Sequence, residues 1–208
     1  MIDFKSEICQ DINKVTQYDK PFIITFSGLP ECGKTMIARQ LSKDLGIFLL
    51  SNDYVRNYFY QFTKEYNEEI RKEIERKVKK INLYRLKKLL MTRTSFVYDR
   101  DFNIEEQYKI LDIIGKLVHM DLIKIKVNST DEENLKRIKN RNMDYNKIYE
   151  GVIGDKVEYL SSYPEEEYYK IKSRKPQMIP DEFFDYVLDS ENFCIESLEK
   201  SIKYQIRK

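Results

Sequence analysis

A short segment near the start of the chain combines two glycines with a lysine and a threonine at a spacing that suits phosphate binding. It reads Gly28, Leu29, Pro30, Glu31, Cys32, Gly33, Lys34 and Thr35, and it fits G-x-x-x-x-G-K-[ST] at every fixed position. Glycine lets the backbone turn tightly and brings N–H groups close to phosphate oxygens. A helix that begins here offers further N–H groups and a positive end. The segment therefore predicts a nucleoside triphosphate site.

Two residues of this loop carry side chains with a chemical task. We expect Lys34 to reach the β- and γ-phosphates of ATP, and the hydroxyl of Thr35 to contact Mg²⁺. Cys32 lies close to a helix N-terminus, where a thiolate is stabilised. We interpret it as a variable position of the motif and not as a nucleophile.

A second group of polar residues follows a predicted strand at 47–50. Ligands of open α/β sheets collect beyond the carboxyl ends of the strands, so Asp53 is expected near the phosphate loop. A carboxylate there can accept the proton of an attacking hydroxyl. Arg56 is one helical turn later and could bind an anionic group of the acceptor. The alternative is that Asp53 only stabilises a helix N-terminus, with Arg56 on the surface.

Two further groups complete the candidate site. Asp99 follows a predicted strand, where a carboxylate could hold Mg²⁺, and Asp101 competes for that role. Arg137 and Arg141 are four residues apart, on one face of a predicted helix. From a lid, both could neutralise charge on a transferred phosphoryl group. Arg174 is a weaker candidate, and the single histidine, His119, is expected at a helix C-terminus.

Alternating strands and helices must position these residues. Buried apolar runs predict strands at 22–26, 47–50, 95–98, 122–127 and 183–188. Apolar spacing predicts helices at 2–15, 34–45, 54–62, 68–91, 104–119, 131–140 and 195–206. In the helix at 68–91, Glu73 with Lys77 and Glu75 with Lys79 are spaced as i,i+4 ion pairs.

The order of these elements predicts an α/β fold with three layers, α/β/α, a mainly parallel sheet and a helical lid. We expect one domain over residues 1–208, with a helical acceptor-side insertion at 57–94 and a lid and variable segment at 137–180. The formal net charge of +2 gives no strong argument for or against a nucleic-acid partner. Three cysteines without a pairing or zinc pattern, and no signal peptide or apolar span, favour a cytoplasmic protein.

The order of the motifs resembles the P-loop kinases of the polynucleotide 5′-kinase, zeta-toxin and chloramphenicol phosphotransferase group. The resemblance covers roughly residues 20–141 and rests on Lys34 with Thr35, on Asp53 with Arg56, on Asp99, and on Arg137 with Arg141. It implies that Asp53 is the general base, that Arg56 contacts a substrate phosphate and that the lid arginines close over the γ-phosphate. Glu31 departs from the group, because many relatives have glycine there.

These observations predict an ATP- and Mg²⁺-dependent kinase that transfers the γ-phosphoryl group to a hydroxyl of a small molecule or of a nucleic-acid 5′-end. A nucleoside monophosphate kinase is an alternative, since Gly28 and Pro30 also occur in such loops. A nucleotide-dependent switch or ATPase without a hydroxyl acceptor is another, favoured by the long charged helix at 68–91. The acceptor, the oligomeric state and the pathway are open.

Overall fold

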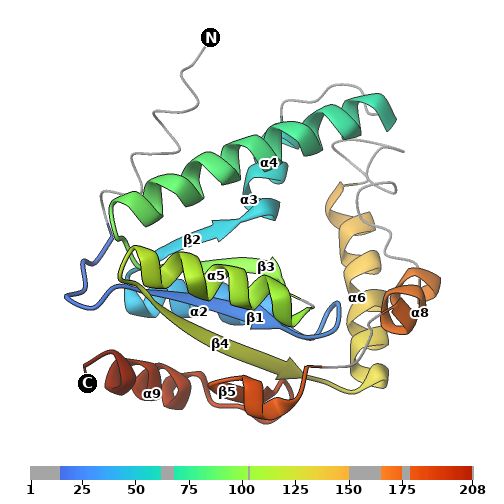
Figure 1. Ribbon diagram of the computed structural model, residues 1–208. Helices are drawn as coiled ribbons and strands as arrows, with labels where there is room; N and C mark the ends of the chain where they lie inside the picture. The colour runs from blue at the N-terminus through green and yellow to red at the C-terminus, as the bar shows by residue number, and fades with distance from the viewer. Residues whose placement is uncertain (1–14, 62–67, 103, 150–164, 175–178, 208) are drawn as a thin grey trace.

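The core of the protein is one sheet with helices on both faces (Figure 1). The computed structural model describes residues 15–61, 68–102, 104–149, 165–174 and 179–207, so the helix expected at 2–15 lies almost wholly outside the described residues. The five strands run parallel in the order β2-β3-β1-β4-β5. The elements are β1 (Phe22–Ser27), α2 (Lys34–Leu45), β2 (Phe48–Ser51), α3 (Asn52–Gln61), α4 (Glu68–Met91), β3 (Phe96–Asp101), α5 (Glu105–Leu117), β4 (Asp121–Asn128), α6 (Asp131–Tyr149), α8 (Glu165–Arg174), β5 (Tyr186–Asp189) and α9 (Ile195–Arg207).

Successive residues of the central strand β1 face opposite layers. Every residue of β1 is buried, as expected for a parallel sheet that is covered on both faces. Phe22, Ile24 and Phe26 pack in a core with residues of α2 and α9. Ile23 belongs to a second core that includes residues of α4 and α5. The predicted three-layer arrangement is therefore confirmed.

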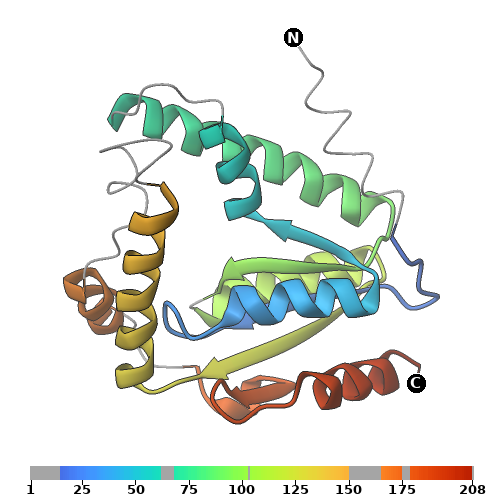
Figure 2. The same ribbon diagram turned by 180° about the vertical axis from the view of Figure 1, so that it is seen from behind.

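The carboxyl ends of the strands all point to the same side of the sheet, because the strands are parallel. Figures 1 and 2 show α6 standing across this side, with α8 packed beside it. The loop after β1 and the start of α3 lie on this side as well. The sheet thus brings together the motifs that the sequence places after its strands.

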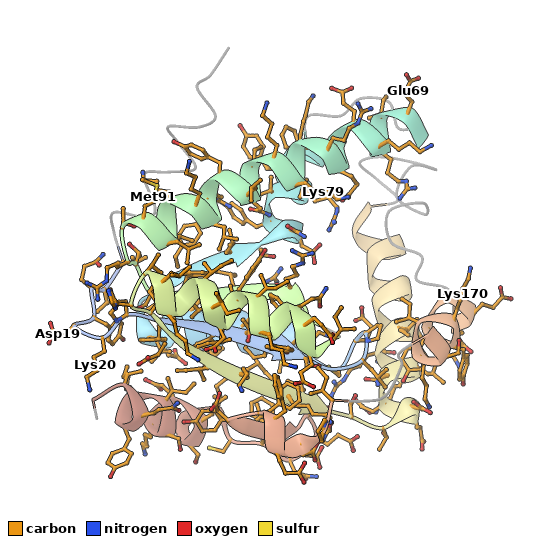
Figure 3. The ribbon with its side chains drawn as sticks, in the orientation of Figure 1. Asp19, Lys20, Glu69, Lys79, Met91 and Lys170 are labelled. Carbon is orange, nitrogen blue, oxygen red and sulfur yellow. The ribbon has the colours of Figure 1, made fainter. Side chains whose placement is uncertain are left out.

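Helix α4 is long and spans the breadth of the molecule. Figure 3 labels Glu69 and Met91 near its two ends, with Lys79 between them. Ile74 and Val78 of α4 pack against Val55 of α3 in a small core of their own. The fully buried Arg85 lies over the ring of Phe48, 5.1 Å from its centroid. These contacts attach α4 to both α3 and β2.

Most element boundaries agree with the sequence prediction, and three differ. Helix α6 runs to Tyr149, nine residues beyond the predicted end at 140. Strand β3 continues through Asp99 to Asp101, because Phe26 of β1 pairs with Asp101 after a bulge. Strand β5 begins at Tyr186 and not at 183, since residues 181–183 form a short 3-10 helix. Among the described residues, no helix is both long enough and apolar enough to cross a bilayer.

Helices α2 and α5 are each followed by a residue with a left-handed backbone conformation, at Gly46 and at His119. Gly46 ends α2 with φ of 63°, a left-handed conformation in which its N–H caps the helix carbonyls. His119 follows the end of α5 and also has a positive φ, 56°, with its N–H donating to the carbonyl of Lys116. The structure thus places His119 at a helix C-terminus, as predicted, on the side of the sheet away from the loop after β1.

Candidate active site

The loop between β1 and α2 is a tight turn that closes onto the N-terminus of the helix. Gly28 and Gly33 have φ of 151° and 99°, which side-chain-bearing residues rarely adopt. A Cβ on Gly28 would lie 2.5 Å from the carbonyl oxygen of Val127, so the neighbouring strand leaves no room for a side chain. Gly33 occupies the N-cap of α2 without a side-chain cap, which leaves backbone N–H groups of the first turn available for an anion.

The ammonium group of Lys34 lies across this loop. Its Nζ donates to the carbonyl oxygens of Gly28, at 3.0 Å, and of Leu29, at 2.7 Å. The buried thiol of Cys32 is 3.7 Å from the same Nζ and belongs to the core under the sheet. The positive charge therefore lies where phosphates held by the loop would be, and Cys32 serves packing.

Glu31 adopts the backbone conformation that explains why glycine suits its position. Its φ is 60°, a left-handed conformation that costs about 1–2 kcal/mol in a residue with a Cβ. The carbonyl oxygen of Glu31 accepts a hydrogen bond from Nη1 of Arg137 at 3.2 Å. The fold thus accommodates a residue other than glycine at this position, and α6 contacts the loop at this peptide.

Thr35 and Asp99 meet where the sequence predicts a magnesium site. Thr35 Oγ1 donates to Oδ1 of Asp99 at 3.2 Å, and Ser51 Oγ donates to Oδ2 of the same carboxylate at 3.1 Å. Burial raises the pKa of Asp99, and the nearby charge of Asp53 raises it further, although the two hydroxyls and Lys34 oppose this. The side chain of Asp101 lies outside the described residues.

This arrangement fits a hard divalent cation. A half-buried carboxylate with a raised pKa is stabilised in its charged form by a nearby cation, and the Thr35 hydroxyl beside it is a second oxygen donor. Mg²⁺ commonly takes only one or two protein oxygens, together with substrate phosphates and water. Thr35 and Asp99 satisfy that requirement, and no group of three or more His, Cys, Asp or Glu in the described part of the chain offers an alternative metal site.

Asp53 and Arg56 lie in the first turns of α3, and both contact charged partners. Nη1 of Arg56 donates to Oδ1 of Asp53. Nε and Nη2 of Arg56 donate to the two carboxylate oxygens of Glu75 on α4, at 2.6 and 3.3 Å. Asp53 is more exposed than its partners, with 53% of its side-chain surface accessible against 27% for Arg56. The carboxylate of Asp53, the predicted base, is therefore largely exposed to solvent.

The start of α3 is fixed by a buried amide from α4. Nδ2 of Asn82 donates to the carbonyl oxygen of Ser51 at 3.2 Å and to Oδ1 of Asn52 at 2.6 Å. Both acceptors immediately precede Asp53, and Asn82 is 5% exposed. The position of Asp53 therefore depends on α4 as well as on β2.

Arg137 of α6 lies over the phosphate loop. Besides Glu31, it contacts Glu133 through Nε at 3.1 Å and Ser190 through Nη1 at 3.3 Å. Its Nη1 is also 3.5 Å from where a Cβ of Gly33 would lie. The side chains of Arg141 and Arg174 lie outside the described residues, so a role for them stays a prediction.

Helix α8 supports α6 through a polar network at the start of the lid helix. Tyr168 is fully buried; its hydroxyl donates to Oδ1 of Asp131 at 2.7 Å and accepts from Nδ2 of Asn134 at 3.1 Å. Lys172 donates to the other oxygen of Asp131. Burial raises the pKa of Tyr168 to about 12, so its phenol keeps the proton that it donates. The network fixes the end of α6 that carries Arg137.

Several residues of the site were not predicted as such. The predicted residues are contacted by Ser51, Glu75, Asn82 and Ser190. Of these only Ser51 had a sequence signal, because it directly follows the strand predicted at 47–50. Glu73 pairs with Lys77 as predicted, at 2.5 Å. The predicted pair of Glu75 with Lys79 is wrong, because Glu75 turns to Arg56.

Comparisons with known proteins agree with this architecture. A family model described as an AAA domain, AAA_18, matches residues 24–158, which is more than half of the chain. The chain belongs to this AAA domain family. Together with the all-parallel sheet, the match establishes a P-loop NTPase-like α/β fold. No curated protein matches the sequence significantly.

Solved structures with the same fold include kinases. A candidate kinase from Chloroflexus aurantiacus J-10-fl superposes with a TM-score of 0.64 at 16% identity, covering 89% of this chain and 98% of its own. APS kinase CysC of Mycobacterium tuberculosis, in complex with AMPPNP and APS, gives 0.51 at 13% identity, with coverages of 91% and 99%. Kti12 of Chaetomium thermophilum, in complex with ADP-AlF3, gives 0.56 at 16%, with coverages of 88% and 98%. At these identities the likeness concerns the fold, which is that of P-loop kinases.

Proposed function

We propose that the protein is an ATP-dependent kinase that transfers the γ-phosphoryl group to a hydroxyl acceptor. The observation that carries this proposal is the position of Asp53, a carboxylate on the acceptor side whose neighbour Asp99 contacts Thr35 of the phosphate loop. A protein that only hydrolyses or exchanges nucleotide has no need of an exposed base at this place. The kinases among the structures with this fold support the same reading.

On the donor side, the loop from Gly28 to Thr35 would bind the triphosphate through backbone N–H groups and Lys34. Lys34 donates to the carbonyl oxygens of its own loop, and binding of ATP would exchange these contacts for contacts with phosphate oxygens. Thr35 and Asp99 would hold Mg²⁺, which supplies charge neutralisation at the β- and γ-phosphates when it is bound. Arg137, hydrogen-bonded above the loop, would neutralise charge on the transferred group.

On the acceptor side, Asp53 would take the proton from the attacking hydroxyl. Arg56 holds Oδ1 of the carboxylate, and Oδ2 accepts no hydrogen bond from the described residues, which leaves it for the acceptor. Because Asn82 fixes the backbone just before Asp53, the carboxylate is held in place before the acceptor binds. Most of the catalysis would come from positioning and charge stabilisation.

The test combines labelled ATP with a panel of sugars, nucleosides and short oligonucleotides with a free 5′-hydroxyl. We expect label to appear in one class of acceptor, and the Asp53→Asn variant to transfer it about 10²- to 10⁴-fold more slowly. Titration with AMPPNP should give the same nucleotide affinity for both proteins. Asp112→Asn, at an exposed position on α5, is the matched control and should not change the rate.

Two outcomes would contradict the proposal. Label that appears only as free phosphate across the panel favours the switch or ATPase alternative. Normal transfer by Asp53→Asn would remove Asp53 from the role of base. The monophosphate kinase alternative is tested by adding nucleoside monophosphates to the panel, since label in them alone would favour it.

A further inference from the structure

The guanidinium group of Arg56 is held on two sides by carboxylates. Its Nε and Nη2 form a forked pair with Oε1 and Oε2 of Glu75, at 2.6 and 3.3 Å, and its Nη1 donates to Asp53. The Nε–Nη2 edge is one that a phosphate or carboxylate ligand would use for a bidentate contact. Glu75 already occupies that edge.

The partner of Arg56 is built into the fold. Glu75 lies on α4 between Ile74 and Val78, which are 4% and 0% exposed and pack against Val55 of α3. Because both neighbours are anchored in this small core, the backbone at Glu75 is fixed relative to Arg56. The pair is partly buried on both sides, with 27% and 30% of the side chains accessible. An entering anion would therefore have to displace Glu75 and would then lie next to it.

The charges around this point also disfavour an anion. Asp53 and Glu75 both pair with Arg56, so among the described residues two carboxylates share this one guanidinium group. Asp99 lies close enough to Asp53 for the two to interact electrostatically. Like charges placed together in a partly buried site cost free energy, and such a site discriminates against ligands of that sign.

We propose that Glu75 determines the acceptor class by neutralising Arg56. This inference rests on the kinase function proposed above and deepens it. The acceptor is then a hydroxyl compound that does not bind through a phosphate or carboxylate of its own, such as a neutral sugar-like or nucleoside-like alcohol. Arg56 acts as a positioning residue for Asp53 and not as a phosphate ligand.

The experiment uses the full chain with its phosphate loop already filled. The protein is saturated with Mg²⁺ and AMPPNP, and thymidine 3′-monophosphate is then titrated in while heat is measured. This probe carries a free 5′-hydroxyl and one phosphate. The variants are Glu75→Gln, which keeps the shape but removes the charge, Arg56→Met, and the two combined. Glu73→Gln, at an exposed position two residues earlier on the same helix, is the control.

We expect the wild type and Glu73→Gln to bind the probe weakly and alike. Glu75→Gln should bind it at least tenfold more tightly, because it releases Arg56, and the double variant should lose that gain. Equal affinity of the wild type and Glu75→Gln would overturn the inference, and so would wild-type binding that Arg56→Met alone abolishes. Failure of AMPPNP itself to bind would contradict the kinase proposal at the first step, before the probe is added.

Discussion

The two halves of the candidate site are built in different ways. The donor half is one continuous stretch, from Gly28 to Thr35, set between a buried strand and the helix that follows it. The acceptor half combines Asp53 and Arg56 of α3 with Glu75 and Asn82 of α4. These two helices pack against each other through a small apolar core of their own. Binding of phosphates would therefore depend on the backbone, and choice of the acceptor on side-chain pairs.

A substitution at a glycine of the loop should have the largest effect, because it should impair both stability and nucleotide binding. In Gly28→Ala the new Cβ would lie 2.5 Å from the carbonyl oxygen of Val127 and 2.6 Å from Sγ of Cys32. We expect a loss of stability of about 1–3 kcal/mol or more, together with loss of nucleotide binding. Urea unfolding and AMPPNP titration would measure the two effects.

The control for that variant is Gln40→Ala, at an exposed position of α2 outside the loop. It should bind nucleotide normally. If Gly28→Ala is as stable as the wild type, the close approach of the loop to β4 is incorrect.

Removing the lid charge should have the next largest effect on transfer. Arg137→Met keeps most of the side-chain length but loses the guanidinium group that lies over the phosphate loop. We expect transfer to slow about 10²- to 10³-fold, with a smaller change in nucleotide affinity. Lys136→Met, at the neighbouring exposed position, should transfer at the normal rate. A normal rate for Arg137→Met as well would exclude a direct role of the Arg137 guanidinium group in phosphoryl transfer.

The smallest effect concerns the support of the lid helix by α8. Hydrogen bonds from Lys172 and then Tyr168 lower the pKa of Asp131. Since the folded state has the lower pKa, the contribution of Asp131 to stability is present above the unfolded pKa, near 3.9, and is lost as pH falls through the folded value.

Asp131→Asn should therefore lower the melting temperature at neutral pH, by about 1–3 °C for such an exposed pair. The difference from the wild type should shrink as pH falls below about 4. Glu132→Gln, at the next residue of α6, should show no such dependence. A constant difference between pH 7 and pH 3 would mean that the charge of Asp131 contributes nothing to the docking of α8.

The same contrast explains what could be predicted from the sequence. The phosphate loop was predicted residue by residue, because its function depends on glycines and a helix start that are contiguous in the chain. The strands of the core followed from apolar runs, since parallel strands are buried on both faces. The extension of α6 to Tyr149 was missed because residues 141–149 lack an apolar period, and a helix of that kind has little sequence signal.

The acceptor side could not be predicted to the same degree. Local spacing paired Glu75 with Lys79 on its own helix, and nothing in the sequence pointed to Arg56 on another helix. In the structure Glu75 pairs with Arg56, because Ile74 and Val78 of α4 pack on Val55 of α3 and bring the two helices together. Contacts between residues that are distant in sequence depend on tertiary packing, which a single sequence reveals only indirectly.

The central claim is that the loop after β1 binds a nucleoside triphosphate with Mg²⁺. Calorimetric titration of the wild type with AMPPNP, with and without Mg²⁺, tests it most directly, with Lys34→Met and the exposed Lys43→Met compared alongside. We predict saturable binding that Mg²⁺ strengthens, that Lys34→Met weakens at least tenfold and that Lys43→Met leaves unchanged. Absence of binding to the wild type, or equal binding by Lys34→Met, would contradict the account.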